Sequence, residues 1–127
     1  MAFEEIFKKI RNRLLGQVDS ETGLPRFPEG EILREPIIFE GTVQMVGFRY
    51  ETQYTAMKLG MTGKAMNLEN GNVLVELQGT KEKIDYCIQY INSVKRFTIT
   101  NQTRTSIPVI KDEKSFICGD EGFGEYF

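Results

Sequence analysis

Apolar residues recur along this chain with two different spacings, and their alternation predicts a small α+β domain over residues 36–118. Where every second residue is apolar we expect a strand, and where apolar residues fall three or four positions apart we expect a helix. In chain order the expected elements are strand 36–43, helix 49–59, strand 62–68, strand 72–79, a helix that begins at 80–83, strand 97–109 and a short candidate strand at 113–118.

This order of strand, helix, strand, strand, helix, strand is typical of the ferredoxin-like sandwich. We therefore expect an antiparallel sheet with both helices on one face and a candidate extra strand at its edge. The dipeptide Asn70–Gly71 predicts a type I′ turn between the two middle strands. One face of the second helix is apolar and should pack on the sheet, through Ile84, Cys87, Ile88 and Ile91.

The two ends of the chain lie outside this pattern and divide it into residues 1–35, 36–118 and 119–127. The first part is predicted to be an amphipathic helix at 3–15 followed by an irregular arm, and the last part an acidic, aromatic tail. The start of the chain is net basic and its finish net acidic, so the ends either attract each other or are separately solvated. We expect a monomer or a weak homo-oligomer formed through these extensions.

The composition is that of an ordinary globular domain: 127 residues, 40% hydrophobic and 27% charged, with a net charge of −2. A negative net charge gives no electrostatic basis for nucleic-acid binding. No segment approaches the ~20 apolar residues that span a bilayer, and no secretory signal is recognisable, so we expect a cytoplasmic location. Cys87 and Cys118 are too few for a disulfide framework and are expected to be small buried apolar residues.

The absence of histidine restricts the available chemistry. Without histidine the chain can form neither a Ser-His-Asp triad nor a Cys-His pair. Two well-separated cysteines cannot complete a thiolate zinc site. Any catalysis must therefore use arginine, lysine, carboxylate, amide, hydroxyl or backbone groups.

The segment from Gly41 to Arg49 lies where a strand passes through a glycine-containing turn into a helix. Backbone N–H groups converge in such a turn, and the helix N-terminus adds partial positive charge. An arginine at the helix start can donate to two oxygens of one phosphate. The spacing thus predicts a phosphate-sized site, although strand–turn–helix joints also hold glycine and arginine for folding alone.

The sequence of this segment, Gly41-Thr42-Val43-Gln44-Met45-Val46-Gly47-Phe48-Arg49, resembles the acylphosphatase signature G-x-V-Q-G-V-x-F-R. It is followed by Leu59-Gly60-Met61-Thr62-Gly63-Lys64-Ala65-Met66-Asn67, which resembles the second family motif, L-G-x-x-G-x-V-x-N. The resemblance covers about residues 36–118. Two motifs in the right order and spacing are much more specific than either alone.

The resemblance implies a ferredoxin-like fold and hydrolysis of small acyl phosphates without a metal or cofactor, with inorganic phosphate as product and inhibitor. Carried over by position, Arg49 matches the arginine that holds the phosphate, and Asn67 matches the asparagine that orients the attacking water. The loop that surrounds the phosphate oxygens is matched by the backbone amides of Gln44, Met45, Val46, Gly47, Phe48 and Arg49.

Three residues depart from the family pattern: Met45, Lys64 and Ala65, the last of which stands where valine is common. Met45 replaces a glycine, which is costly only if the backbone there has a positive φ; its side chain is either simply tolerated or forms a wall that shapes access of the acyl group. Lys64 replaces a common tryptophan and either steers an anionic substrate or lies on a solvated face. We expect Tyr50, Tyr54, Tyr86 and Tyr90 to pack helices on the sheet rather than to stack bases.

Two other functions compete with an acylphosphatase. An acylphosphatase-like domain of weak or lost activity would serve as a binding or regulatory module, which the departures and the two extensions motivate. An RNA-binding ferredoxin-like domain is disfavoured, because the strand at 72–79 lacks the aromatic pattern that stacks bases.

Overall fold

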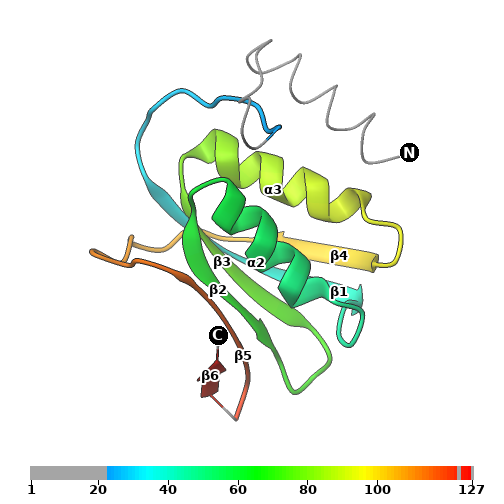
Figure 1. Cartoon of the computed structure of the whole chain (residues 1–127). Helices are drawn as coiled ribbons and strands as arrows, with labels where there is room; N and C mark the ends of the chain where they lie inside the picture. The colour runs from blue at the N-terminus through cyan, green and yellow to red at the C-terminus, as the bar shows by residue number, and fades with distance from the viewer. Residues whose placement is uncertain (1–22, 123, 127) are drawn as a thin grey trace.

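The computed structural model describes residues 23–122 and 124–126. The helix predicted at 3–15 lies outside these residues. Six strands form one sheet in the order β4-β1-β3-β2-β5-β6, and two helices cover one of its faces (Figure 1). The elements are β1 (Leu33–Thr42), α2 (Phe48–Lys58), β2 (Thr62–Asn67), β3 (Val73–Gly79), α3 (Lys81–Ser93), β4 (Thr98–Arg104), β5 (Phe116–Asp120) and β6 (Gly124–Tyr126).

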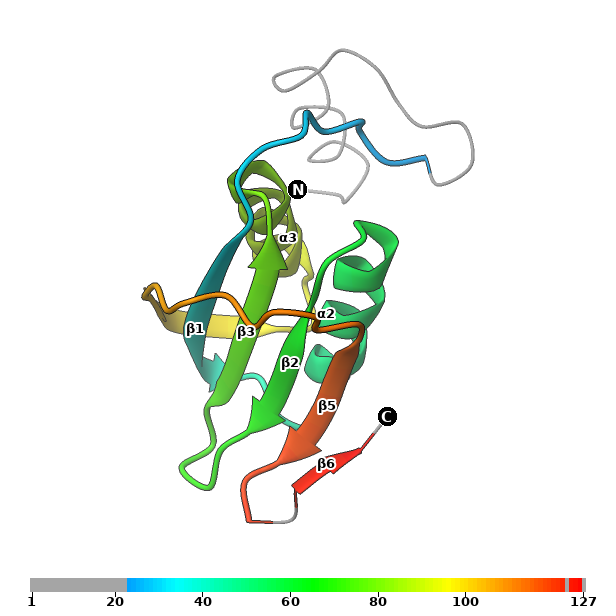
Figure 2. The same cartoon turned by 90° about the vertical axis from the view of Figure 1, so that its left-hand side faces the viewer.

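The sheet is mixed rather than antiparallel. Strands β1, β2, β3 and β4 pair antiparallel as predicted, but β5 runs parallel to β2, with Ala65 opposite Cys118. The reason is the connection: the chain crosses the sheet between β4 and β5 and therefore enters β5 in the direction of β2 (Figure 2). Strand β6 then returns antiparallel along β5.

Two strand boundaries differ from the sequence pattern. Strand β1 begins at Leu33, before the expected start, because Arg34 pairs with Gln78 of β3. Strand β4 ends at Arg104, and beyond it only an isolated bridge from Ile107 to Arg34 continues the pairing.

The predicted type I′ turn at Asn70–Gly71 is wrong, because Asn70 does not have the positive φ that this turn requires. The β2–β3 connection is instead a three-residue loop, closed by hydrogen bonds from Leu68 N–H to Asn72 O (2.9 Å) and from Gly71 N–H to Leu68 O (3.1 Å).

The core lies between the two helices and the sheet. Alternate residues of β1 and β3 point into it, and the predicted apolar face of α3 is buried, as are both cysteines. Its least exposed members include Ile37, Phe39, Phe48, Ala56, Ala65, Val73, Ile84 and Cys87. In the described part of the chain, no helix is long and apolar enough to cross a membrane.

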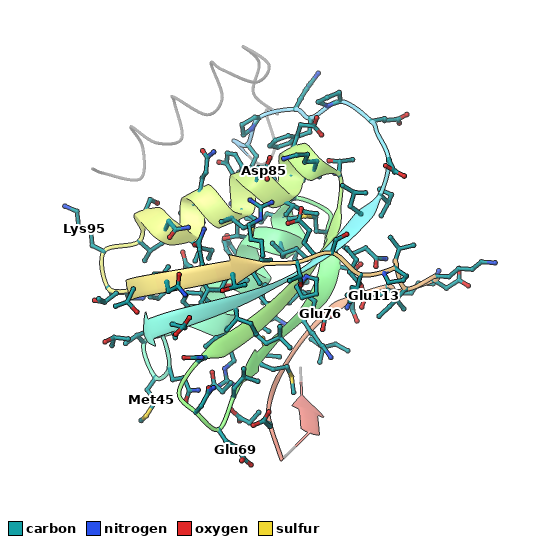
Figure 3. All side chains as sticks on the ribbon, turned by 180° about the vertical axis from the view of Figure 1, so that it is seen from behind. Met45, Glu69, Glu76, Asp85, Lys95 and Glu113 are labelled. Carbon is teal, nitrogen blue, oxygen red and sulfur yellow. The ribbon has the colours of Figure 1, made fainter. Side chains whose placement is uncertain are left out.

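The other face of the sheet contains a buried arginine. Arg34 has only 1% of its side chain exposed, and its guanidinium donates to Glu76 (2.8 Å), Gln78 (3.0 Å) and Glu113 (2.7 Å). Glu113 belongs to the segment that crosses the sheet between β4 and β5, and Figure 3 shows it close to Glu76. The Gln78 amide also exchanges hydrogen bonds with the backbone of Ile110. This network fixes the crossing segment and thereby the approach of β5 to β2.

We expect Arg34→Ala to lower the free energy of unfolding by about 3–5 kcal/mol, because it leaves two carboxylates in poorly solvated positions without their partner. Urea titration followed by circular dichroism measures this. The control is Arg104→Ala, whose guanidinium pairs with Glu35 and Asp85 at the surface and should contribute less than about 1 kcal/mol. Equal losses in both variants would show that the buried network does not hold the crossing segment.

Candidate active site

The connection between β1 and α2 is a tight loop with two left-handed residues. Gly47 has a φ of 80° and immediately precedes the first helical residue, and Met45 has a φ of 62°. Glycine adopts this conformation freely, whereas for methionine it costs roughly 1–2 kcal/mol. Met45 stands where the family commonly has glycine, and it therefore bears the conformational cost of a positive φ.

The N–H groups of this loop have no backbone acceptor. Within the described residues, the backbone N–H groups of residues 44–48 donate to no backbone carbonyl. They lie at the N-terminus of α2, where the helix dipole adds partial positive charge. Such a loop can bind an anion.

The loop is fastened to the β2–β3 hairpin by the side chain of Gln44. Its Nε2 donates to the carbonyl oxygens of Leu68 (2.7 Å) and Asn72 (2.8 Å). Both protons of the amide are thereby used, so the Gln44 side chain positions the loop and has no donor left for a ligand. Because Leu68 follows Asn67 directly, these bonds also fix the distance between the loop and Asn67.

Arg96 braces the same loop from the other side. Its Nε donates to Val46 O (2.9 Å), one terminal nitrogen pairs with Glu51 (3.1 Å), and the guanidinium lies 4.8 Å from the centre of the Phe97 ring. Glu51 also accepts a hydrogen bond from the Tyr90 hydroxyl. The Glu51 carboxylate of α2 is therefore linked to α3 through Tyr90 and to the loop through Arg96.

Arg49 stands on the first turn of α2 and reaches across to β5. Its guanidinium nitrogen Nη1 donates to Gly119 O (2.7 Å) and to Asp120 Oδ1 (3.0 Å). The Arg49 side chain is 25% exposed and that of Asp120 is 32% exposed, so solvent screens this ion pair. The two contacts hold the guanidinium at the edge of the cavity described below.

Asn67 is the last residue of β2 and pairs with Asp120 in the parallel ladder. Its backbone oxygen accepts from Glu121 N–H (2.8 Å). Its side-chain oxygen Oδ1 is buried and accepts no hydrogen bond from the described residues. A buried amide oxygen without a donor is uncommon, and a donor supplied by water or a ligand would satisfy it.

A cavity of about 150 Å³ lies between these groups. It is lined by Val43, Met45, Gly47, Phe48, Arg49, Tyr50, Gln53, Asn67 and Cys118. Burial raises the pKa of the Cys118 thiol, an effect that the nearby Arg49 only partly offsets, so the thiol stays protonated at neutral pH and is a poor nucleophile. The cavity can thus hold an anion at Arg49 and a water at Asn67.

The structure brings Arg49, Asn67 and the loop together, as the sequence predicted. It does not bring Lys64 to the cavity: this residue lies on the opposite face of β2 and approaches Glu76 of the neighbouring strand (3.7 Å). Sequence reasoning missed Arg96 and Asp120, because neither lies within either motif and each meets the site only through strand and helix packing.

Comparisons with known proteins identify the family to which the chain belongs. A family model for acylphosphatase matches residues 36–118, well over half of the chain. The chain belongs to the acylphosphatase family. It is 46% identical over 74 residues to an acylphosphatase of Vibrio parahaemolyticus, an alignment covering 58% of this chain and 82% of that protein. It is 36% identical over 89 residues to an acylphosphatase of Clostridium beijerinckii, covering 67% of this chain and 96% of the relative.

A solved acylphosphatase has the same fold. The crystal structure of acylphosphatase from Bacillus subtilis superimposes with a TM-score of 0.61 and 27% identity, covering 66% of this chain and 94% of that one. The ferredoxin-like α+β architecture of the acylphosphatase family therefore holds for this chain.

We expect Met45→Gly to raise the free energy of unfolding by about 0.5–1 kcal/mol. Removing the left-handed strain gains roughly 1–2 kcal/mol, and the greater freedom of glycine in the unfolded chain returns part of it. Because the Met45 side chain is 99% exposed, no packing is lost. Thermal and urea unfolding measure the change. The control is Met57→Gly at an exposed position of helix α2, which should lower the free energy of unfolding by about 1 kcal/mol. A Met45→Gly protein less stable than the parent would mean that this φ is not strained.

Proposed function

We propose that this protein is an acylphosphatase, which hydrolyses the carboxyl–phosphate bond of small acyl phosphates to a carboxylate and inorganic phosphate. One observation carries the proposal: the Arg49 guanidinium and the Asn67 amide line the same cavity, beside a loop whose N–H groups have no backbone acceptor. Its family membership supports the same activity.

The phosphate group is held by Arg49 and the loop amides of residues 44–49. Charge on the equatorial phosphate oxygens is spread in the transition state, and donors fixed beforehand stabilise it without reorganising. The bonds from Gln44 and Arg96 keep the loop in this shape before substrate arrives. Arg49 is similarly held in place by Gly119 and Asp120.

Asn67 orients the attacking water through its buried side-chain oxygen. The water oxygen forms a bond to phosphorus while the bond from phosphorus to the carboxyl oxygen breaks, and the carboxylate leaves with the electron pair. The proton of the water passes to a phosphate oxygen. Because a carboxylate is a good leaving group, positioning and charge stabilisation suffice, and neither a histidine base nor a thiol nucleophile is needed.

We also propose a cellular location and an oligomeric state. We place the enzyme in the cytoplasm, as a monomer or a weak homo-oligomer that associates through residues 1–35 and 119–127. The substrate is a small acyl phosphate rather than a nucleic acid.

A second candidate is an acylphosphatase-like binding module with weak or no turnover. Two observations favour it: the loop carries a strained methionine, and the Asp120 carboxylate already pairs with Arg49. Hydrolysis of benzoyl phosphate by the wild-type protein, competitively inhibited by inorganic phosphate, separates an enzyme from such a module.

We expect Arg49→Ala to lower kcat/KM for benzoyl phosphate by at least about 10³ and to weaken inhibition by phosphate, because the main cationic donor is lost. Asn67→Ala should lower kcat by about 10²–10³ and leave phosphate affinity nearly unchanged, because it removes only the oxygen that orients water. Steady-state kinetics with and without inorganic phosphate measure both.

The matched control for these variants is Lys64→Ala, which removes a cation from the same strand as Asn67 but not from the cavity. It should behave as the wild type. Wild-type rates in Arg49→Ala and Asn67→Ala would refute the assigned roles.

We expect Asp120→Asn to tighten binding of inorganic phosphate by roughly fivefold. The amide keeps an oxygen that can accept from Arg49, while the negative charge that repels the incoming anion is removed; such a repulsion is worth about 1 kcal/mol near the surface. Isothermal titration calorimetry measures the affinity. The gain should shrink at ~1 M salt, where the Debye length is about 3 Å. Weaker binding at both salt concentrations would mean that the charge of Asp120 is needed to position Arg49.

A further inference from the structure

Met45 combines a strained backbone with a side chain that packs against almost nothing. It is the most exposed of the large apolar residues in the described chain, at 99%, and its φ is 62°. Figure 3 shows its side chain extending outward from the loop, away from the body of the domain. The side chain gains no packing within the domain that offsets this strain, which leaves its apolar surface available to a bound molecule.

Tyr50 is the second exposed apolar side chain at this point of the molecule. Tyr50 and Tyr54 were expected to pack on the sheet, but 68% of Tyr50 and 52% of Tyr54 are exposed. The Tyr50 ring is nevertheless held in place: it lies parallel to that of Tyr54, with centroids 6.4 Å apart and planes 11° apart. Lys58 Nζ lies 5.0 Å from the centre of the Tyr54 ring. A ring supported in this way can receive a flat apolar group at little entropic cost.

Both residues line the cavity that contains Arg49 and Asn67. Its volume of about 150 Å³ is that of a cavity that holds one benzene molecule. Once a phosphate group and a water occupy the loop and Asn67, a ring-sized acyl group does not fit inside as well. It must lie at the opening, where Met45 and Tyr50 are the large apolar lining residues that are exposed.

We propose that Met45 and Tyr50 bind the acyl group, and that they favour acyl phosphates with an aromatic carboxyl portion over acetyl phosphate. The inference rests on the proposed function, because it takes the phosphate to be bound at Arg49. An aromatic ring can stack on Tyr50 and contact the Met45 thioether at its edge, and both contacts are favourable. The single methyl group of acetyl phosphate offers neither a face for Tyr50 nor an edge for the sulfur.

The test compares kcat/KM for benzoyl phosphate with kcat/KM for acetyl phosphate in each variant. The ratio within one variant cancels any general effect of the substitution on the loop, and comparing that ratio with the wild-type ratio cancels the different intrinsic reactivities of the two substrates. Tyr50→Ala and Met45→Ala should each lower the ratio by about 3- to 10-fold, and the double variant by more. Tyr50→Phe should keep it, because the ring is retained. Met57→Ala is the matched control, an exposed apolar residue of α2 that does not line the cavity.

A binding assay separates this inference from the proposed hydrolysis. Phenylphosphonate and methylphosphonate resist hydrolysis, and their dissociation constants can be measured by calorimetry in the same variants. If the wild type turns over neither substrate but Tyr50→Ala selectively weakens phenylphosphonate, the hydrolase proposal fails and the aromatic-binding surface stands. The acyl-binding surface is refuted, even where hydrolysis is robust, if Tyr50→Ala and Met45→Ala change neither the ratio of the two kcat/KM values nor the ratio of the two dissociation constants.

Discussion

The two hydrogen bonds from the Gln44 side chain to Leu68 and Asn72 are the contact on which the geometry of the site depends. They join the β1–α2 loop to the β2–β3 hairpin, two segments that share no regular secondary structure. Without them the loop amides and Asn67 would be related only through the packing of the flanking Val43 and Phe48 in the core. Both carbonyls lie next to the end of β2, so a single amide sets the separation between the anion-binding loop and Asn67.

The parts of this site that follow one another in sequence could be predicted, and those brought together by packing could not. The strand, turn and helix around Arg49 follow from local glycine and apolar spacing, and Asn67 follows from a second motif. Arg96 and Asp120 are charged residues without a local signal, since their importance depends on where α3 ends and on β5 pairing parallel to β2. The predicted antiparallel pairing holds for β1 to β4, and it is wrong only for β5, whose direction depends on the same packing.

Backbone angles are a second feature that could not be predicted from the sequence. The sequence indicated that Met45 would be strained only if its φ were positive, and a single sequence cannot supply that angle. At Asn70–Gly71 the local rule itself gave the wrong turn, because the loop closes one residue wider and Gly71 takes the left-handed position alone. The apolar faces were predicted correctly, since burial follows periodicity, whereas the exposure of Tyr50 follows from the position of the helix over the sheet.

The parallel pairing of β2 with β5 also determines when in folding the site comes into being. Partners such as Ala65 and Cys118 are more than fifty residues apart, and pairs so distant form late because closing the chain between them costs entropy before any contact compensates. Helix α2 and the β2–β3 hairpin can form from local contacts, yet neither holds Arg49 near Asn67 by itself. A chain that has folded everything except β5 would have most of the core and a loop tied to Asn67, but its Arg49 would lack Gly119 and Asp120, which hold the guanidinium at the cavity.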